Sequence, residues 1–409
     1  MARPTIGDNV ASYRRTQMTQ EQLAEASGIS VETIRKLEQN ERLDARMDTL
    51  RKLARALGVQ TSALLAGSTA KSTAQRETEN DNLALMELRK MLTPVPGTQL
   101  LAPDPSAPAP TTTSVRNSLN MIHRAYDNDE FAAVLDGLSP LLAASQALAG
   151  SAPTSDQQTA NGLLAHAYRI AGRTLIQLRA HDLAYQALNT ALDASTKSGN
   201  ELRRAGVISS MCWLLMRQGR FAEAQQLALD CADSIEPRFS RAAPPQLVVW
   251  GWLMLRGAAA AARDARDDDA NAMLDAAAAA AARLGDRNLD RNFDTAGLCV
   301  AKVQMQRVET AVVLGDPDRA LALSATMPST SQASPSCRWR HQLDVAWSHT
   351  QLGQYSKATD VLVGVRRHAS VWLRQQTYAR EIVETIAAGR RRAMSKQLAE
   401  LANLVGVGL

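Results

Sequence analysis

One short stretch near the start of the chain holds five side chains that could donate or accept hydrogen bonds or make an apolar contact with a patterned surface. They are Val31, Glu32, Thr33, Arg35 and Lys36. On a helical wheel centred on Ile34 and Leu37, four of them turn to the opposite side, and Thr33 lies on the flank. Such groups donate, accept or offer a methyl contact, which is what reading base edges in a DNA major groove requires. Glu32 would then accept from cytosine N4, and Val31 would contact a thymine methyl group.

Glu32 has a second interpretation, because it precedes Lys36 by four residues. A carboxylate and an ammonium group at this spacing form an ion pair on a helix surface. The whole stretch could also belong to a domain that contacts another protein instead of DNA. Residues 1–67 carry ten Lys and Arg against eight Asp and Glu, a balance too even to choose between these readings.

The residues before and within this stretch predict two helices joined by a tight corner. Thr19 followed by Gln22 has the spacing of a capping box, so a helix begins there. Gly28 ends that helix, because glycine adopts the positive φ that a sharp turn demands. Ser30 then caps a second helix that runs to Asn40 and carries the five side chains.

Neighbouring segments supply further helices to cover the corner. "IGDNVASYRR" predicts a helix before it, and "DTLRKLARALGV" predicts one after it, with leucines on the inward side. "TSALLAG" adds a short fifth helix. We therefore predict a compact five-helix domain over residues 1–67.

This segment resembles the helix-turn-helix of the XRE type, the class of the phage Cro and lambda-repressor-like proteins. The matching features are "TQEQLAEASGIS" with Gly28 at the turn, "KLEQNER", and "LRKLARALGV" followed by "LLAG". The resemblance implies that the second helix enters the major groove and that Gln20 holds a phosphate. It also implies roles for residues on and after that helix: Val31, Glu32, Thr33 and Lys36 face bases, with Arg35 on the same arc, and Arg46 approaches the backbone or minor groove.

Composition predicts an all-α protein and gives no sign of catalysis. Hydrophobic residues make up 45% of the chain but aromatic ones only 4%, and alanine, the strongest helix former, occurs in long runs. The net charge of +5 permits a nucleic-acid partner without requiring one. The sequence contains no run of roughly 18 uninterrupted apolar residues, the length that predicts a membrane span. We therefore expect a cytoplasmic protein. The cysteines, which are scattered without a C-x-x-C pair, predict idle or buried thiols and no metal or cofactor site: Cys212, Cys231, Cys299 and Cys337.

Residues 68–114 predict a linker. The segment contains a short amphipathic helix over residues 83–92 and then a proline-rich tether, because proline excludes regular helix and strand and favours an extended spacer.

Residues 115–409 predict a stack of helix pairs. Junctions such as "GRFAEA", "GDPDRA" and "GQYSKA" resemble those of tetratricopeptide (TPR) repeats, in which small residues let two helices approach. Ala187, Ala224, Ala272, Ala320 and Ala358 serve as the predicted anchors, one for each repeat. The expected architecture is a TPR-like α-solenoid with a concave groove, used for sensing or for dimerisation. Four polar residues on the predicted first helices are candidate ligand contacts: Asn161, Arg169, Arg204 and Arg340.

The order of head, tether and helical repeats resembles that of bacterial signal-responsive regulators, among them the peptide-sensing RRNPP group. The resemblance implies a sequence-specific, DNA-binding transcription regulator, nucleoid-associated and controlled by a peptide or small molecule. We also expect a homodimer on two half-sites, because one head buries too little surface for tight specific binding. Two alternatives remain. The protein could be a constitutive repressor whose solenoid only dimerises, or a TPR protein-interaction adaptor. We expect no enzyme activity, no cofactor and no membrane partner.

Overall fold

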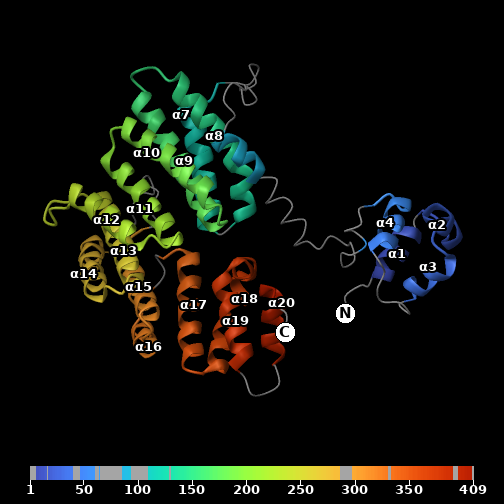
Figure 1. Ribbon diagram of the computed structural model, residues 1–409. Helices are drawn as coiled ribbons and strands as arrows, with labels where there is room; N and C mark the ends of the chain where they lie inside the picture. The colour runs from blue at the N-terminus through green and yellow to red at the C-terminus, as the bar shows by residue number, and fades with distance from the viewer. Residues whose placement is uncertain are drawn as a thin grey trace. The chain divides into compact units, whose positions relative to one another are not determined.

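The computed structural model describes residues 6–15, 17–39, 47–59, 64, 85–93, 109–128, 130–285, 297–329, 333–389 and 395–407. The chain divides into two compact units, Met1–Asn82 and Leu83–Leu409 (Figure 1). Every regular element within the described ranges is a helix, which confirms the predicted all-α class.

The first unit contains four described helices around one small core. They are α1 (Ile6–Arg15), α2 (Gln20–Ser27), α3 (Val31–Glu38) and α4 (Met47–Ala56). Leucine and other aliphatic side chains from all four meet in a cluster that excludes water: Val10, Leu23, Ile34, Leu37, Leu53 and Leu57. Leu64, from the predicted fifth helix, is fully buried in the same cluster, and Asn9 Nδ2 donates to its carbonyl oxygen at 3.1 Å. The rest of the predicted fifth helix lies outside the described residues.

The corner between α2 and α3 forms as its local residues dictate. The Thr19 hydroxyl accepts from the Gln22 amide, and the Gln22 side chain accepts from the Thr19 amide at 2.8 Å. Gly28 ends α2 with φ +66° and donates its amide to the Ala24 carbonyl. Ser30 then caps α3 by accepting from the Thr33 amide. The direction of α3 is therefore set by local interactions between Thr19 and Thr33.

Gly28→Ala is expected to lower the free energy of unfolding of the first unit by about 1 kcal/mol, because a residue with a Cβ is strained at positive φ. A Cβ at this position would meet no atom within 4 Å, so steric overlap adds nothing. Gly28→Asn is the matched control, since asparagine tolerates this region better. Hydrogen exchange of α2 and α3 amides in the full chain measures the loss. Equal protection in the Ala variant and the parent would contradict this account.

The second unit begins with a short helix over residues 85–92 and continues with paired helices. Leu88 and Met91 of the short helix are buried in the same cluster as residues of α7 and α8, so this helix belongs to the core of the second unit. The paired helices are α7 (Thr112–Asp127), α8 (Phe131–Ser151), α9 (Gln157–Gln177), α10 (His181–Lys197), α11 (Glu201–Arg217), α12 (Phe221–Ser234), α13 (Pro244–Arg263), α14 (Asp267–Leu284), α15 (Val300–Val313), α16 (Pro317–Ala325), α17 (Pro335–Gln351) and α18 (Tyr355–Gln375). A last pair follows, α19 (Thr377–Gly389) and α20 (Lys396–Val405).

One turn geometry recurs between the helices of each pair from α7/α8 to α17/α18. The residue before the second helix has φ between −83° and −109° and ψ between 53° and 78°, and its amide donates to the carbonyl five residues earlier. The fourth residue after it is fully buried in every case: Val134, Ala184, Ala224, Ala270, Ala320 and Ala358. These six equivalent turns establish the TPR-like solenoid.

Two predicted repeat anchors are wrong by a few residues. The buried equivalents of Ala224 are Ala184 and Ala270, whereas Ala187 lies one turn further along its helix and Ala272 is exposed. The turn before Ala224 contains Gly219 at positive φ, but the matching positions are Arg179 and Ala265, also at positive φ. Because neither is glycine, the sequence cue for the turn is absent there. The corrected intervals between anchors from Ala184 onward are 40, 46, 50 and 38 residues.

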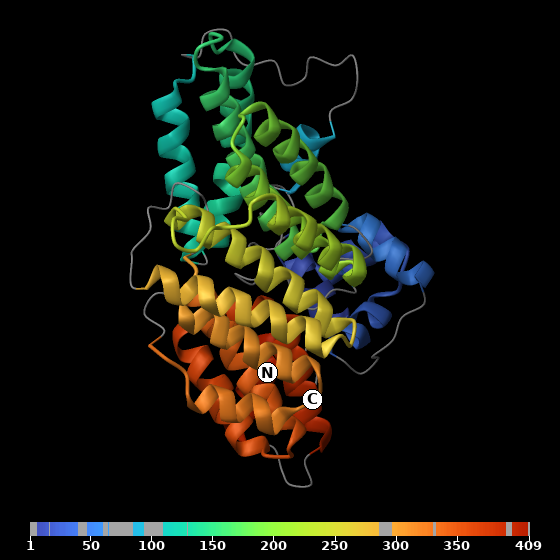
Figure 2. The ribbon, with the colours of Figure 1, turned by 90° about the vertical axis from the view of Figure 1, so that its left-hand side faces the viewer.

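The final helices of the second unit contact its first repeats. Phe131, at the start of α8, packs against the core cluster formed mainly by α7 to α11. It also packs against the cluster formed by α17 to α20. Arg179, after α9, donates a hydrogen bond to Thr377, at the start of α19. The stack of helices, seen from two directions in Figures 1 and 2, therefore returns toward its beginning.

Helix α8 is long and apolar enough to cross a membrane by length and composition alone, with a mean hydropathy of 1.4. Its leucines instead form part of the core between α7 and α9, where Leu138, Leu141 and Leu142 are almost fully buried. The apolar composition of α8 is thus explained by packing inside the unit.

Candidate nucleic-acid interface and interior cavity

Helix α3 presents one face to the core and the other to solvent. Ile34 and Leu37 are 0% and 1% exposed, while Glu32, Arg35 and Lys36 are exposed and Thr33 is half-buried. Val31, at 37% exposed, adds an aliphatic side chain to this surface. The structure thus brings together the five side chains that the sequence placed on this arc.

The exposed face of α3 contains an ion pair. Lys36 Nζ lies 2.8 Å from Glu32 Oε1, and the side chains are 46% and 68% exposed. The hydrogen bond from Lys36 holds the pKa of the Glu32 carboxyl below its ordinary value. Pairs this exposed contribute little to stability, so Lys36 can exchange its partner for a phosphate or base at small cost. In the free protein Glu32 and Lys36 bind each other.

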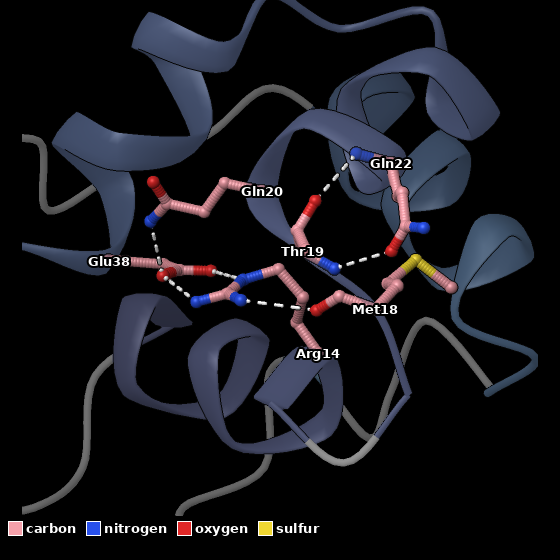
Figure 3. A network of polar contacts seen from close by, with 6 residues as sticks. All are labelled: Arg14, Met18, Thr19, Gln20, Gln22 and Glu38. Atoms are coloured by element: carbon pink, nitrogen blue, oxygen red, sulfur yellow. Dashed lines mark hydrogen bonds and ion pairs between the residues drawn. The ribbon is translucent and has the colours of Figure 1, made fainter.

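A partly buried polar network joins α1, α2 and the end of α3 (Figure 3). Arg14 Nε and Nη2 donate to the two Glu38 oxygens at 2.6 and 2.8 Å, and Arg14 Nη1 donates to the Met18 carbonyl at 3.2 Å. Gln20 Nε2 donates to Glu38 Oε2 at 2.7 Å. The side chains of Arg14 and Glu38 are only 12% and 6% exposed. This network fixes the far end of α3 against the two preceding helices.

Glu38 stays ionised because of its partners. Burial alone would raise its pKa, but the hydrogen bonds from Arg14 and Gln20 and the Arg14 charge hold the pKa of the Glu38 carboxyl below its ordinary value. The resemblance implies that Gln20 contacts a phosphate, and it implies no role for Glu38. In the structure the Gln20 amide is held at the start of α2 by Glu38. Arg46, the remaining predicted DNA contact, lies outside the described residues.

The second unit contains a cavity of about 430 Å³ that is partly open to solvent. Its walls come mainly from the first helix of each pair and carry both charged and aromatic groups. The lining residues are Tyr126, Asp127, Arg173, Gln177, Trp213, Met216, Arg217, Phe221, Trp252, Leu255, Arg256, Ala259, Arg263, Lys302, Met305, Gln306, Glu309, Ser334, Ser336, Cys337, Arg340, His341, Asp344, Trp372 and Gln376.

Of the four predicted ligand contacts, the cavity wall includes Arg340 and none of the other three. Asn161 is buried and donates to the Gln157 carbonyl at 2.8 Å. Arg169 is buried, and its Nε donates to Ser210 Oγ at 3.0 Å. Arg204 is half-buried on α11. The structure therefore does not bring these four side chains to one place.

Two carboxylates in the cavity have strongly shifted pKa values. Glu309 pairs with Arg263 at 2.5 Å. Burial opposes its ionisation, but the charges of Arg263 and Arg340 lower the pKa of Glu309 to about 2. Asp344 lies 3.9 Å from Arg340 Nε, and burial raises its pKa to about 7 although the Arg340 charge opposes the rise. Of these two carboxylates, Glu309 is held ionised by its cationic neighbours, and Asp344 is the one whose pKa burial moves toward neutral pH.

Cys337 differs from the other thiols, which the structure buries. Its Sγ accepts from Lys302 Nζ at 2.6 Å and from Ser334 Oγ at 3.0 Å. Burial would raise the pKa of this thiol, but the charge and hydrogen bond of Lys302 lower it below its ordinary value. In contrast, burial raises the pKa of Cys212 to about 12. The described residues contain no group of three or more His, Cys, Asp or Glu side chains arranged to hold a metal ion.

Comparison with known proteins bears on the first unit. Residues 13–64, which span α2, the Gly28 corner and α3, match the family model described as "Helix-turn-helix". The first unit is a helix-turn-helix domain. In it, α2 and α3 are the paired helices, and the arc from Val31 to Lys36 is the exposed face of the second.

Two other comparisons concern the whole chain. A solved structure that resembles it is that of Bacillus thuringiensis PlcR in complex with the peptide PapR7 and DNA, at 10% identity and a TM-score of 0.32. The alignment covers 87% of this chain and 98% of that one. No curated protein sequence matches this chain.

Proposed function

We propose that this protein is a sequence-specific, DNA-binding regulator of transcription in which α3 reads bases. The observation that supports this most is the orientation of α3 in the helix-turn-helix domain. Ile34 and Leu37 anchor the helix from behind, while the polar arc remains exposed and its one ion pair is weakly held. A helix with this exposure can enter a major groove and donate or accept at base edges.

The protein is proposed to act as a homodimer. A single helix-turn-helix domain reads only a few base pairs, whereas two on a two-fold axis read half-sites about 34 Å apart, one turn of DNA. The second unit is proposed to supply the dimer contact and to sense a peptide or small molecule. A ligand acts in this way only if it binds one arrangement of the dimer better than another. Such a regulator works in the cytoplasm, on the nucleoid.

The direct test is selection of bound fragments from genomic DNA by the full-length protein, with and without cell extract. The proposal predicts enrichment of a short two-fold repeated motif and a change in retention when extract is present. Enrichment without any effect of extract would support a constitutive repressor. Retention of all fragments alike would reject sequence-specific binding.

Thr33→Ala and Lys36→Ala are each expected to weaken binding to the selected operator by about 1 to 3 kcal/mol, the contribution of a lost base contact. Arg55→Ala, which removes an exposed cation from α4, controls for net charge. Fluorescence anisotropy with operator and scrambled duplexes measures the effect. If both α3 variants retain the operator affinity of the parent, the assignment of α3 as the reading helix is wrong.

A further inference from the structure

The cavity of the second unit contains more positive than negative side chains. Six cations line it: Arg173, Arg217, Arg256, Arg263, Lys302 and Arg340. The lining carboxylates are Asp127, Glu309 and Asp344. Glu309 already forms an ion pair with the Arg263 guanidinium. Asp344 Oδ1 lies 3.9 Å from Arg340 Nε, too far for a hydrogen bond. The acidic groups of the wall therefore leave part of its positive charge unmatched.

Two of these cations form no direct ion pair in the described part of the chain, and the charge of Glu309 acts on both only from a distance. Arg256 lies over the rings of Trp213 and Trp252, 5.4 and 5.3 Å from their centroids, and its buried Nε has no hydrogen-bond partner. Burial and the nearby charge of Arg173 lower the pKa of Arg256 to about 10, which still leaves it charged at neutral pH. Arg217, one helical turn from Trp213 on α11, forms no ion pair either.

An unmatched, partly desolvated cation is costly to the fold. Stacking on aromatic rings recovers only part of that cost. A group retained at such cost in the wall of a cavity is a candidate for ligand recognition.

The remainder of the wall is apolar. Met216, Leu255, Ala259, Met305 and Trp372 line it between the charges. The volume of about 430 Å³ falls in the range of sites that enclose small organic molecules. The lining thus combines a cationic centre with apolar sides.

We infer that this cavity binds a compact organic anion, whose acid group pairs with Arg256 and Arg217 and whose apolar body lies against the methionine and leucine side chains. The acid group can be a carboxylate, sulfonate or phosphate ester. The assignment of this cavity as the regulatory site rests on the function proposed above. Binding itself is a property of the second unit and is measured without DNA.

The test uses two probes that differ by one acid group. 1-Anilinonaphthalene-8-sulfonate carries a sulfonate, and N-phenyl-1-naphthylamine has the same rings without it. The full chain is expected to bind the sulfonate at least tenfold more tightly, the effect of a hydrogen bond to a charged group. All six tryptophans lie between Trp213 and Trp372, and three of them line the cavity, so quenching of their fluorescence reports the bound probe.

Arg256→Met and Arg217→Met are each expected to weaken sulfonate binding by roughly tenfold or more and to leave the neutral probe unchanged. Arg220→Met is the matched control, because Arg220 is exposed and pairs with Glu223 on the surface. Arg256→Met is also expected to melt no lower than the parent, since it removes a desolvated cation. Far-UV circular dichroism checks the fold of each variant.

Equal affinity for the two probes would overturn the inference, and so would unchanged sulfonate binding in both cavity variants. An equal loss in Arg220→Met would show that net charge, not the cavity, attracts the probe. If Arg256→Met does not fold, Arg217→Met alone decides. Fragment selection on DNA tests the proposed function separately, so a failure there leaves this result standing.

Discussion

Glu38→Ala is expected to destabilise the helix-turn-helix domain while the second unit is unaffected. The substitution leaves the Arg14 side chain, which is 12% exposed, without its carboxylate. Leaving a partly buried polar group without its partner costs about 1 to 3 kcal/mol. That is a large fraction of the stability of a domain this small. Hydrogen exchange of α1 to α3 measures the loss, and tryptophan fluorescence, which reports only the second unit, should be unchanged.

Glu32→Ala is the matched control, since it removes a second glutamate from the same helix. Glu32 is 68% exposed and pairs with Lys36 on the surface, so its loss should leave the protection of these helices nearly unchanged. Replacing Arg14 and Glu38 together by methionine should recover part of the stability, because no charge is then left unpaired. Equal protection in the Glu38 and Glu32 variants would show that the network contributes nothing.

The same network has a defined pH dependence. The folded-state pKa of Glu38 is lowered, so its contribution is present above the ordinary pKa of a glutamate and is lost as the pH falls through the lower folded value.

The helix-turn-helix domain could be predicted because its signals are local. Thr19, Gln22, Gly28 and Ser30 each act on residues within a few positions, and the structure shows the capping box, the left-handed corner and the cap that they specify. The Arg14 and Glu38 network could not be predicted in this way, since the two residues are 24 positions apart. Only the folded arrangement of α1, α2 and α3 brings them together.

The solenoid shows the same limit. Its glycine-containing turns were recognisable, but Arg179 and Ala265 adopt the same positive φ without glycine, and the predicted register slipped at both. The cavity was less predictable still. Arg217, Arg256, Lys302 and Arg340 come from four different helices, and no spacing in the sequence signals that they face one space. The place of Arg340 on the first helix of a pair predicts a ligand contact. Asn161, Arg169 and Arg204 share that feature but do not line the cavity.

Cavity residue Asp344 is expected to make the stability of the second unit depend on pH. Its folded pKa, about 7, lies above the ordinary 3.8, so the protonated form stabilises the fold. This contribution is fully present below the ordinary pKa and is lost as the pH rises through about 7. The charged or titratable groups around it are Arg340 on its own helix, Glu309 on α15, Arg263 on α13 and Tyr378 on α19.

His341, on the same helix, acts in the opposite direction. Burial lowers its pKa to about 4, so it stabilises the fold increasingly as the pH rises toward its ordinary 6.5. The opposite pH dependences that Asp344 and His341 give to the free energy of unfolding partly cancel in the parent protein. A comparison with Asp344→Asn removes the cancellation, because His341 and every other group are common to both chains.

The difference in free energy of unfolding between Asp344→Asn and the parent should therefore change by about 2 to 3 kcal/mol from pH 5 to pH 8, in favour of the Asn variant at the higher pH. Urea titrations followed by tryptophan fluorescence measure it, since all six tryptophans lie in the second unit. Asp360→Asn, at an exposed position on α18, is the control and should show no such change. A constant difference across this range would mean that Asp344 is ionised throughout, with Arg340 outweighing burial as the determinant of its charge.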